Sequence, residues 1–180
     1  MLIFKEQDRE FLFPDGWVVL QYDEDNFRTQ HLREHEAVDF VAISPHGQLL
    51  LIEVKDYRGY STSENRAKIT NGDLVRSIGK KVVATVAGLL AGHFRKQISN
   101  YQRYAQMLAD RSQSIRVLAL IEHSFLPHDR AQIALLSFTD QLKSRLRWLD
   151  QAHAWVGNGD QLQKKFGIEV RNLPRSPNLS

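Results

Sequence analysis

The strongest constraint on the fold is a pair of apolar segments that three turn-forming residues separate. Residues 38–44 (VDFVAIS) and 48–55 (QLLLIEVK) are rich in β-branched and aliphatic side chains, and residues 45–47 (PHG) lie between them. Runs of this kind predict β-strands, and a three-residue connection that contains glycine is typical of an antiparallel hairpin. The sequence therefore predicts a β-hairpin over residues 38–55.

The turn also determines which residues face each other across the hairpin. If Gly47 adopts the left-handed conformation, Ser44 pairs with Gln48, and the same register places Asp39 opposite Glu53. Directly opposed residues have Cβ atoms about 4.5–5.5 Å apart, which is close enough for two carboxylates to hold one cation. A two-residue turn would instead send Asp39 to the other face of the sheet.

The rest of the chain reads as alternating helices and strands. The predicted elements are a helix at 3–13, strands at 17–22, 115–121 and 133–136, helical residues at 74–110 with a break near 88–93, and a helix at 139–150, with loops at 23–36 and 56–73. This order predicts an α/β fold built on a mixed sheet with the antiparallel hairpin at its centre. We expect one domain over residues 1–171 and a frayed tail at 172–180, which is rich in proline, serine and asparagine.

Composition excludes several classes of protein. The 180 residues contain no cysteine, which rules out disulfides, thiolate zinc sites and a cysteine nucleophile. The longest apolar run, residues 82–92, is far shorter than the ~20 residues of a membrane span, and the amino terminus does not resemble a signal peptide. We therefore expect a soluble, cytoplasmic protein that does not enter a membrane.

Charge is distributed unevenly along the chain. Residues 1–39 hold 4 basic and 10 acidic residues, a net charge of −6, whereas residues 40–180 hold 20 basic and 11 acidic residues, a net charge of +9. A basic surface is what contacts to DNA phosphates require, although such asymmetry also arises in ordinary enzymes. DNA is therefore an expected partner.

Acidic and basic side chains share one face of the predicted hairpin. Glu53 and Lys55 are two residues apart on a strand and point to the same side, and Asp39 is predicted opposite Glu53. Carboxylates on apolar strands are costly to bury unless a partner neutralises them, and Mg²⁺ prefers oxygen ligands. Lys55 would then orient a metal-bound water or balance developing charge. The alternative is an ion pair of Lys55 with Glu53 or Asp39 at a strand end.

These residues resemble a known superfamily. Asp39, thirteen intervening residues and Glu53-Val54-Lys55 are similar to the PD-(D/E)XK nucleases, and the segment EAVDFVAISPHGQLLLIEVKDYRG most resembles the nuclease-related domain known as NERD. The resemblance extends over residues 3–60 and is loose beyond them. It implies a restriction-endonuclease-like αβββαβ core, with a central mixed sheet flanked by helices, and metal-dependent hydrolysis of phosphodiester bonds.

The resemblance also assigns roles by position. Asp39 and Glu53 match the metal-binding acids, the Val54 carbonyl would complete the ligand set, and Lys55 matches the catalytic lysine. The family usually adds an acid from its first helix, for which Glu6 and Glu10 compete. Glu6 lies at the better distance from the end of that helix, although either residue could instead belong to a solvated helix face. The proline of the superfamily name is replaced by valine here.

A glutamine and a tyrosine in the helical stretch form a second candidate element. Gln97 and Tyr101 are similar to the Gln-x-x-x-Tyr pair that follows the catalytic lysine in RecB-like members. Helical spacing places both on one face, where they would support the site. Pairs of this type are also common by chance.

The leading hypothesis is a Mg²⁺-dependent phosphodiesterase that cleaves DNA, with Mn²⁺ as a substitute metal. The alternative is a non-catalytic module that binds nucleic acid or docks a partner in a helicase-linked DNA repair or defence system. No ATP-binding motif is present in the sequence, so we expect the chain to stand alone, to be a fragment, or to work with a helicase or ATPase partner chain. Endonucleolytic or exonucleolytic action stays open, as does the oligomeric state, for which a dimer is one option.

Overall fold

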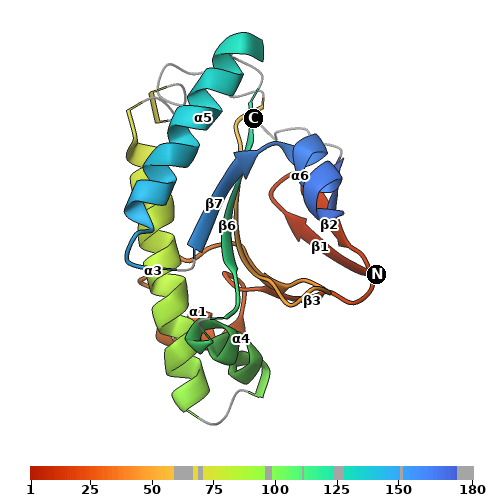
Figure 1. Cartoon of the computed structure of the whole chain (residues 1–180). Coiled ribbons are helices and arrows are strands. Elements are labelled where there is room, and N and C mark those ends of the chain that lie inside the picture. Colours follow the sequence, from red (N-terminus) through yellow and green to blue (C-terminus); the bar gives the residue numbers. More distant parts are fainter. Residues whose placement is uncertain are drawn as a thin grey trace, which may run out of the picture.

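The centre of the structure is a mixed sheet of five strands in the order β3-β4-β5-β6-β7 (Figure 1). The computed structural model describes residues 1–58, 67–68, 71–95, 99–110, 112–123, 128–150 and 152–173. The first three strands of the sheet pair antiparallel and the last three run parallel. Their bounds are β3 (Val18–Gln21), β4 (Phe40–Ile43), β5 (Leu49–Asp56), β6 (Ile115–Glu122) and β7 (Ala152–Gly157). The α/β class and the mixed sheet are confirmed.

The hairpin of β4 and β5 has the predicted turn and register. Gly47 has a φ of 72°, and its N–H donates to the Ser44 carbonyl at 2.9 Å. The Ser44 N–H in turn donates to the Gln48 carbonyl at 2.9 Å, and Phe40 pairs with Ile52. The register that would bring the residues before β4 beside the end of β5 is therefore confirmed.

Replacing Gly47 with alanine should lower the free energy of unfolding by about 1 kcal/mol, because a Cβ atom makes the left-handed conformation costly. The space itself is open, since a Cβ at this position would meet only the Gln113 side chain at 3.6 Å. Gly47→Asn should cost less, because asparagine tolerates this conformation better. Urea denaturation of the three proteins measures the difference, and equal stability of the alanine variant and the wild type would contradict this account.

Helices cover one face of the sheet. α3 (Asp73–Phe94) and α5 (His128–Arg145) lie side by side along it, and α4 (Ser99–Ala109) packs against α3 (Figure 1). The larger hydrophobic core lies between these helices and the sheet. Its buried members include Val41, Leu51, Ile78, Val82, Val117 and Phe138.

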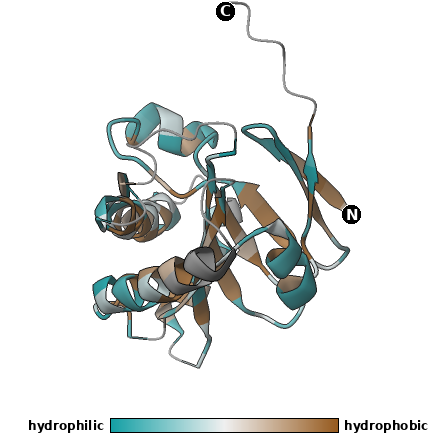
Figure 2. Cartoon of the chain, turned by 90° about the horizontal axis from the view of Figure 1, so that it is seen from above, coloured by the Kyte–Doolittle hydropathy of each residue, from teal (hydrophilic) through white to brown (hydrophobic). Residues whose placement is uncertain are grey.

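The opposite face is covered by a second, three-stranded sheet and one helix. This antiparallel sheet has the order β1-β2-β8, with β1 (Leu2–Glu6), β2 (Arg9–Phe13) and β8 (Glu169–Asn172), and the helix is α6 (Gly159–Phe166). Figure 2 shows the apolar strands enclosed between the helices on one side and the small sheet on the other. Aromatic rings fill this second core, where Phe4, Phe11 and Phe13 surround Phe40.

The helix predicted at residues 3–13 is therefore wrong, because this segment forms the hairpin of β1 and β2. Almost all of β2 is buried, so the strand shows no alternation of polar and apolar residues that would reveal it. The turn also lacks glycine, and Gln7 instead adopts a positive φ of 52°. The sequence therefore shows neither the alternating pattern nor the glycine turn that would indicate a hairpin.

The helical stretch at 74–110 does form two helices, but the break lies elsewhere. α3 continues through Gly88 and Gly92 to Phe94, and α4 begins at Ser99. A Cβ on Gly88 would collide with the Tyr22 hydroxyl, and one on Gly92 would collide with the Tyr101 ring. The two glycines thus permit close packing inside the helix and do not end it.

Three other expectations are corrected. Residues 133–136, expected as a strand, lie within α5, since a short apolar run does not distinguish a strand from a buried helix. The expected loop at 23–36 contains α1 (Asn26–His31), whose first N–H groups are capped by Asp25. β7, α6 and β8 all follow residue 150, where no element was predicted, and β8 reaches Asn172 at the start of the expected tail.

Some expectations fall outside the description. Most of the loop expected at 56–73 and residues 174–180 of the tail lie outside the described residues. Within the part of the chain that is described, no helix has both the length and the apolar character needed to cross a bilayer.

Candidate functional site

Three carboxylates from separate parts of the chain meet near the centre of the molecule. Ligand oxygens of Glu6, Asp23 and Asp39 all lie within 4.8 Å of one another. Glu6 ends β1, Asp23 follows β3, and Asp39 immediately precedes β4. We call these residues the acidic cluster. Glu6 is thus placed beside Asp39, although it comes from a strand and not from the predicted helix.

Main-chain and side-chain hydrogen bonds hold the acidic cluster together. The Tyr22 N–H donates to the Asp39 carbonyl at 2.8 Å, which fixes Asp23 next to Asp39. The Gln21 side chain donates to the Lys5 carbonyl at 2.9 Å and to Glu6 Oε2 at 3.4 Å, which ties β1 to β3. Glu10, the other acid considered for this position, instead lies opposite Lys5 within the small sheet.

Asp39 is the most buried member of the acidic cluster, with 4% of its surface exposed. Its Oδ2 accepts a hydrogen bond from the Val54 N–H at 2.5 Å, which joins the end of β5 to the start of β4. Burial raises the pKa of Asp39 well above its ordinary value, and the negative charge of Glu53 raises it further. The site therefore concentrates negative charge where water cannot screen it, and a cation would relieve that cost.

Glu53 is fully buried beside the acidic cluster and faces two lysines. Its Oε1 lies 2.6 Å from Lys55 Nζ and 2.8 Å from Lys81 Nζ. Its Oε2 is buried and has no hydrogen-bond partner among the described residues. The ion pair considered as an alternative from the sequence is therefore present, and it leaves one carboxylate oxygen of Glu53 available to a further ligand.

The Val54 carbonyl and Tyr101, which the sequence analysis also placed in the site, have other partners. The Val54 carbonyl accepts a hydrogen bond from Gln7 Nε2 at 3.3 Å. Tyr101 is fully buried, and its hydroxyl donates to Asp25, the residue that caps α1. Tyr101 thus fixes α4 to the start of α1, and its hydroxyl donates to a residue outside the acidic cluster. Gln97 lies outside the described residues.

Sequence reasoning missed two residues of the site. Asp23 directly follows a predicted strand, and the end of a strand can hold a carboxylate near a neighbouring strand. Nothing in the sequence shows, however, that β1 places Glu6 beside Asp23. Lys81 lies 28 residues after Glu53, on a helix whose rotation about its axis only the packed structure reveals. Its apolar neighbours Ile78 and Val82 are the available signal, because they mark this side of the helix as buried.

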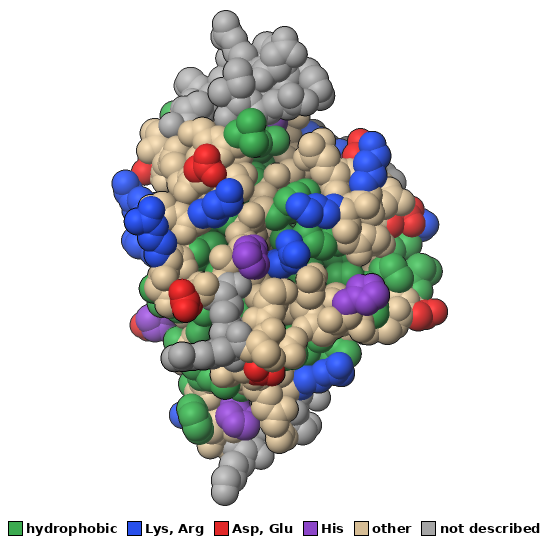
Figure 3. All heavy atoms as spheres, in the orientation of Figure 1, with side chains coloured by type: hydrophobic (Ala, Val, Ile, Leu, Met, Phe, Trp, Pro, Cys, Tyr) green, Lys and Arg blue, Asp and Glu red, His purple; other side chains and the backbone are tan. Residues whose placement is uncertain are grey.

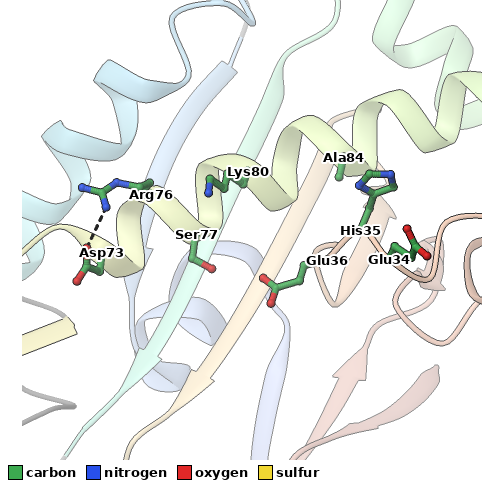
Figure 4. A pocket seen from close by; sticks show the side chains of 8 residues that line it. All are labelled: Glu34, His35, Glu36, Asp73, Arg76, Ser77, Lys80 and Ala84. Atoms are coloured by element: carbon green, nitrogen blue, oxygen red, sulfur yellow. Dashed lines mark hydrogen bonds and ion pairs between the residues drawn. The ribbon is translucent and has the colours of Figure 1, made fainter.

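A hollow of about 340 Å³ opens beside the two lysines. Its lining includes Lys55, Tyr57, Lys68, Ser77 and Lys81. A second hollow of about 480 Å³ shares Glu36, Asp73 and Ser77 with it, and Figure 4 shows its side chains lying along α3. Together they form a depression along α3 that leads to Lys55.

Basic side chains are dispersed over the face of the molecule that Figure 3 shows. On the face seen in Figure 3, lysines and arginines from several elements are separated by acidic and uncharged side chains. Within the depression, Arg76 pairs with Asp73 at 3.2 Å. The face in Figure 3 thus shows no continuous basic patch, whereas Lys55, Lys68 and Lys81 come together along the lining of the hollow.

Because of the acidic cluster, we expect the stability of the folded protein to depend on pH. Burial and the charges of Asp23 and Glu24 raise the pKa of Glu6 from 4.5 to about 7. The folded protein thus holds this proton more tightly than the unfolded chain, so the stabilisation present below pH 4.5 is lost as the pH rises through about 7. With a chelator present, the melting temperature should therefore fall between about pH 5 and about pH 8.

If the acidic cluster holds a divalent cation, adding Mn²⁺ at the higher pH should restore the melting temperature, because the ion would bind the charged form of the folded site. Glu6→Gln should reduce the dependence on pH, and Glu10→Gln, which changes an acid outside the cluster, should not. A melting temperature of the wild type that is flat over this range would contradict the electrostatic description.

No family model matches the chain, and no curated protein and no solved structure shows detectable similarity to it.

Proposed function

We propose that this chain is a metal-dependent nuclease that hydrolyses DNA phosphodiester bonds. The observation that carries the proposal is the arrangement around the hairpin. The buried carboxylate of Asp39 lies with Glu6 and Asp23, while Glu53 and Lys55 lie beside it at the end of β5. Acidic oxygens next to an ammonium group on two paired strands are the groups that metal-assisted attack of water on a phosphodiester requires.

The donor set fits Mg²⁺ or Mn²⁺. All the candidate ligands are carboxylate oxygens, which hard divalent cations prefer, and the acidic cluster contains no sulfur atom. One octahedral ion with bonds of about 2.1 Å needs ligand oxygens roughly 3–4 Å apart, close to the spacing in the acidic cluster. Glu6, Asp23 and Asp39 would hold the ion, and the buried Oε2 of Glu53, which has no hydrogen-bond partner among the described residues, would be a further candidate ligand.

Side chains next to the proposed metal ligands would bind the phosphate and orient the attacking water. A bound divalent ion would lower the pKa of a coordinated water and stabilise charge on a phosphoryl oxygen. Lys55, whose side chain is 24% exposed and lines the hollow, would contact the phosphate or orient the attacking water. Lys68 lines the same hollow and would attract the DNA backbone.

The fold supports a restriction-endonuclease-like core in part. Three antiparallel strands, a helical crossover through α3 and a parallel fourth strand follow one another as that core requires. Its first helix is the departure, because β1 and β2 stand in that position and supply the acid from a strand. The proposal therefore rests on the site and not on the first element of the core.

The test is a cleavage assay on single-stranded, duplex and branched DNA with Mg²⁺ or Mn²⁺. We expect cleavage of at least one substrate that a chelator abolishes. Comparing circular and linear substrates separates endonucleolytic from exonucleolytic action. Salt-dependent binding of DNA without cleavage in either metal would contradict the nuclease proposal and favour a module that binds nucleic acid or docks a helicase or ATPase chain.

A further inference from the structure

We propose that Lys81 is a positioning residue that holds Glu53 in place so that Lys55 is free to move to the substrate. The inference deepens the proposed function and rests on it. It starts from one carboxylate oxygen that two lysines share, although only one of those lysines belongs to the hairpin.

The arrangement is unusual because both ammonium groups contact the same atom. Lys55 Nζ and Lys81 Nζ lie 2.6 Å and 2.8 Å from Oε1 of Glu53, while Oε2 has no partner among the described residues. Two like charges on one acceptor repel each other. A buried carboxylate needs at least one cationic partner, so either lysine can leave without stranding Glu53, but both cannot.

The two lysines differ in how firmly they are held. Lys81 projects from the middle of α3, between the fully buried Ile78 and Val82, and its side chain is 13% exposed. Lys55 lies next to the last residue of β5, and its side chain is 24% exposed. Lys81 is therefore the fixed partner of Glu53, and Lys55 is the partner that can leave.

This division gives each lysine a separate task. Lys81 neutralises Glu53 and keeps Oε1 turned toward α3. Lys55 can then exchange Glu53 for a phosphate oxygen in the hollow that it lines. Without Lys81, the buried Glu53 would have Lys55 as its sole cationic partner among the described residues, and releasing Lys55 would strand a buried charge.

The first test measures the freedom of Lys55 without any substrate. Metal-free protein is treated with acetic anhydride, and mass spectrometry gives the acetylation rate at Lys55. In Lys81→Met this rate should fall by about three- to tenfold, because Lys55 becomes the only charged donor to Glu53. Lys81→Arg should keep the wild-type rate, and Lys164→Met, which removes an exposed lysine on α6, should leave it unchanged.

Unchanged or faster acetylation of Lys55 in folded Lys81→Met would overturn the inference. If Lys81→Met does not unfold cooperatively, Lys81→Gln replaces it and is judged by the same two results.

The second test uses cleavage of DNA in Mn²⁺. In Lys81→Met, kcat should fall by about 10–100-fold, the range for losing a group that orients a reacting residue. KM for DNA should change less than twofold and Lys81→Arg should restore kcat, whereas a higher KM with unchanged kcat would overturn the inference. A wild type that cleaves no DNA would contradict the nuclease proposal, and the acetylation result would still decide the role of Lys81.

Discussion

Asp39→Asn should abolish metal-dependent cleavage of DNA and at the same time stabilise the metal-free protein. The rate of cleavage should fall by at least about 10³-fold, equivalent to about 4 kcal/mol of lost transition-state stabilisation. Asp39 is the buried member of the acidic cluster, and losing its charge would remove one of the proposed ligands of the divalent ion. The cleavage rate is measured in Mn²⁺ with saturating DNA.

The gain in stability has a separate cause. An asparagine at this position still has a side-chain oxygen that can accept the Val54 N–H, so the link between β4 and β5 is kept. The substitution also removes the negative charge of Asp39, whose burial beside Glu53 is unfavourable. The melting temperature with a chelator at about pH 9 should therefore rise, because burial raises the pKa of Asp39 to about 8 and the wild type is mostly in its costly ionised form above that pH. Opposite effects on activity and stability distinguish a functional carboxylate from a structural one.

Asp160→Asn is the matched control, because it removes an exposed carboxylate in the first turn of α6; it should leave the cleavage rate unchanged and should not raise the melting temperature. Glu53→Gln is a less clean variant, since it takes the shared carboxylate away from Lys55 and Lys81 and leaves two ammonium groups without it. A loss of activity in this variant could therefore come from a disturbed fold or from a missing ligand, and the assay would not separate the two causes. Undiminished cleavage by Asp39→Asn would rule out the acidic cluster as the metal site.

The hairpin was predictable because its determinants are local. The turn residues 45–47 set the register, and the apolar strands set which faces are buried. Asp39 and Glu53 could therefore be brought together from sequence alone. Glu53 lies near enough for its charge to raise the pKa of Asp39, but each carboxylate also has partners that the register does not specify, namely the Val54 N–H for Asp39 and Lys81 for Glu53.

The parts of the fold that were missed depend on contacts between distant segments. β2 pairs with β8, which lies about 160 residues later, and this pairing buries a segment whose pattern does not indicate a strand. The position of Glu6 follows from that second sheet. Because the sequence analysis predicted a helix at residues 3–13, it identified Glu6 as a site residue only through the resemblance to a family. Asp23 was missed for the same reason.

Two glycines of α3 should respond to the same substitution with opposite signs. Gly92→Ala should lower the free energy of unfolding by about 2–3 kcal/mol, because the added methyl group overlaps a packed ring. Its Cβ would lie 2.6 Å from Cε2 of Tyr101 and closer still to Cδ2. The Tyr101 ring cannot move aside easily, because it packs edge-on against Phe27 and its hydroxyl group donates a hydrogen bond to Asp25.

Gly79→Ala is the internal control on the same helix. A Cβ at Gly79 would meet only the Arg145 side chain at 3.5 Å, which is ordinary contact with a flexible group. The substitution should therefore stabilise the protein by about 0.5–1 kcal/mol, the difference in helix propensity between glycine and alanine. Thermal and urea denaturation of both variants measure the effects. Shifts of the same sign and size would contradict the packing described for α3 and α4.

The cost at Gly92 can be assigned to the ring by a double-mutant cycle. Tyr101→Ala alone should be destabilising, because it removes a fully buried ring and its hydrogen bond to Asp25. In that background Gly92→Ala should cost almost nothing, since the space that its methyl group needs is then empty. A coupling of about 2 kcal/mol between the two positions would show that α4 is held against α3 by the fit of one ring to one glycine. Independent effects would mean that Gly92→Ala acts on the helix itself.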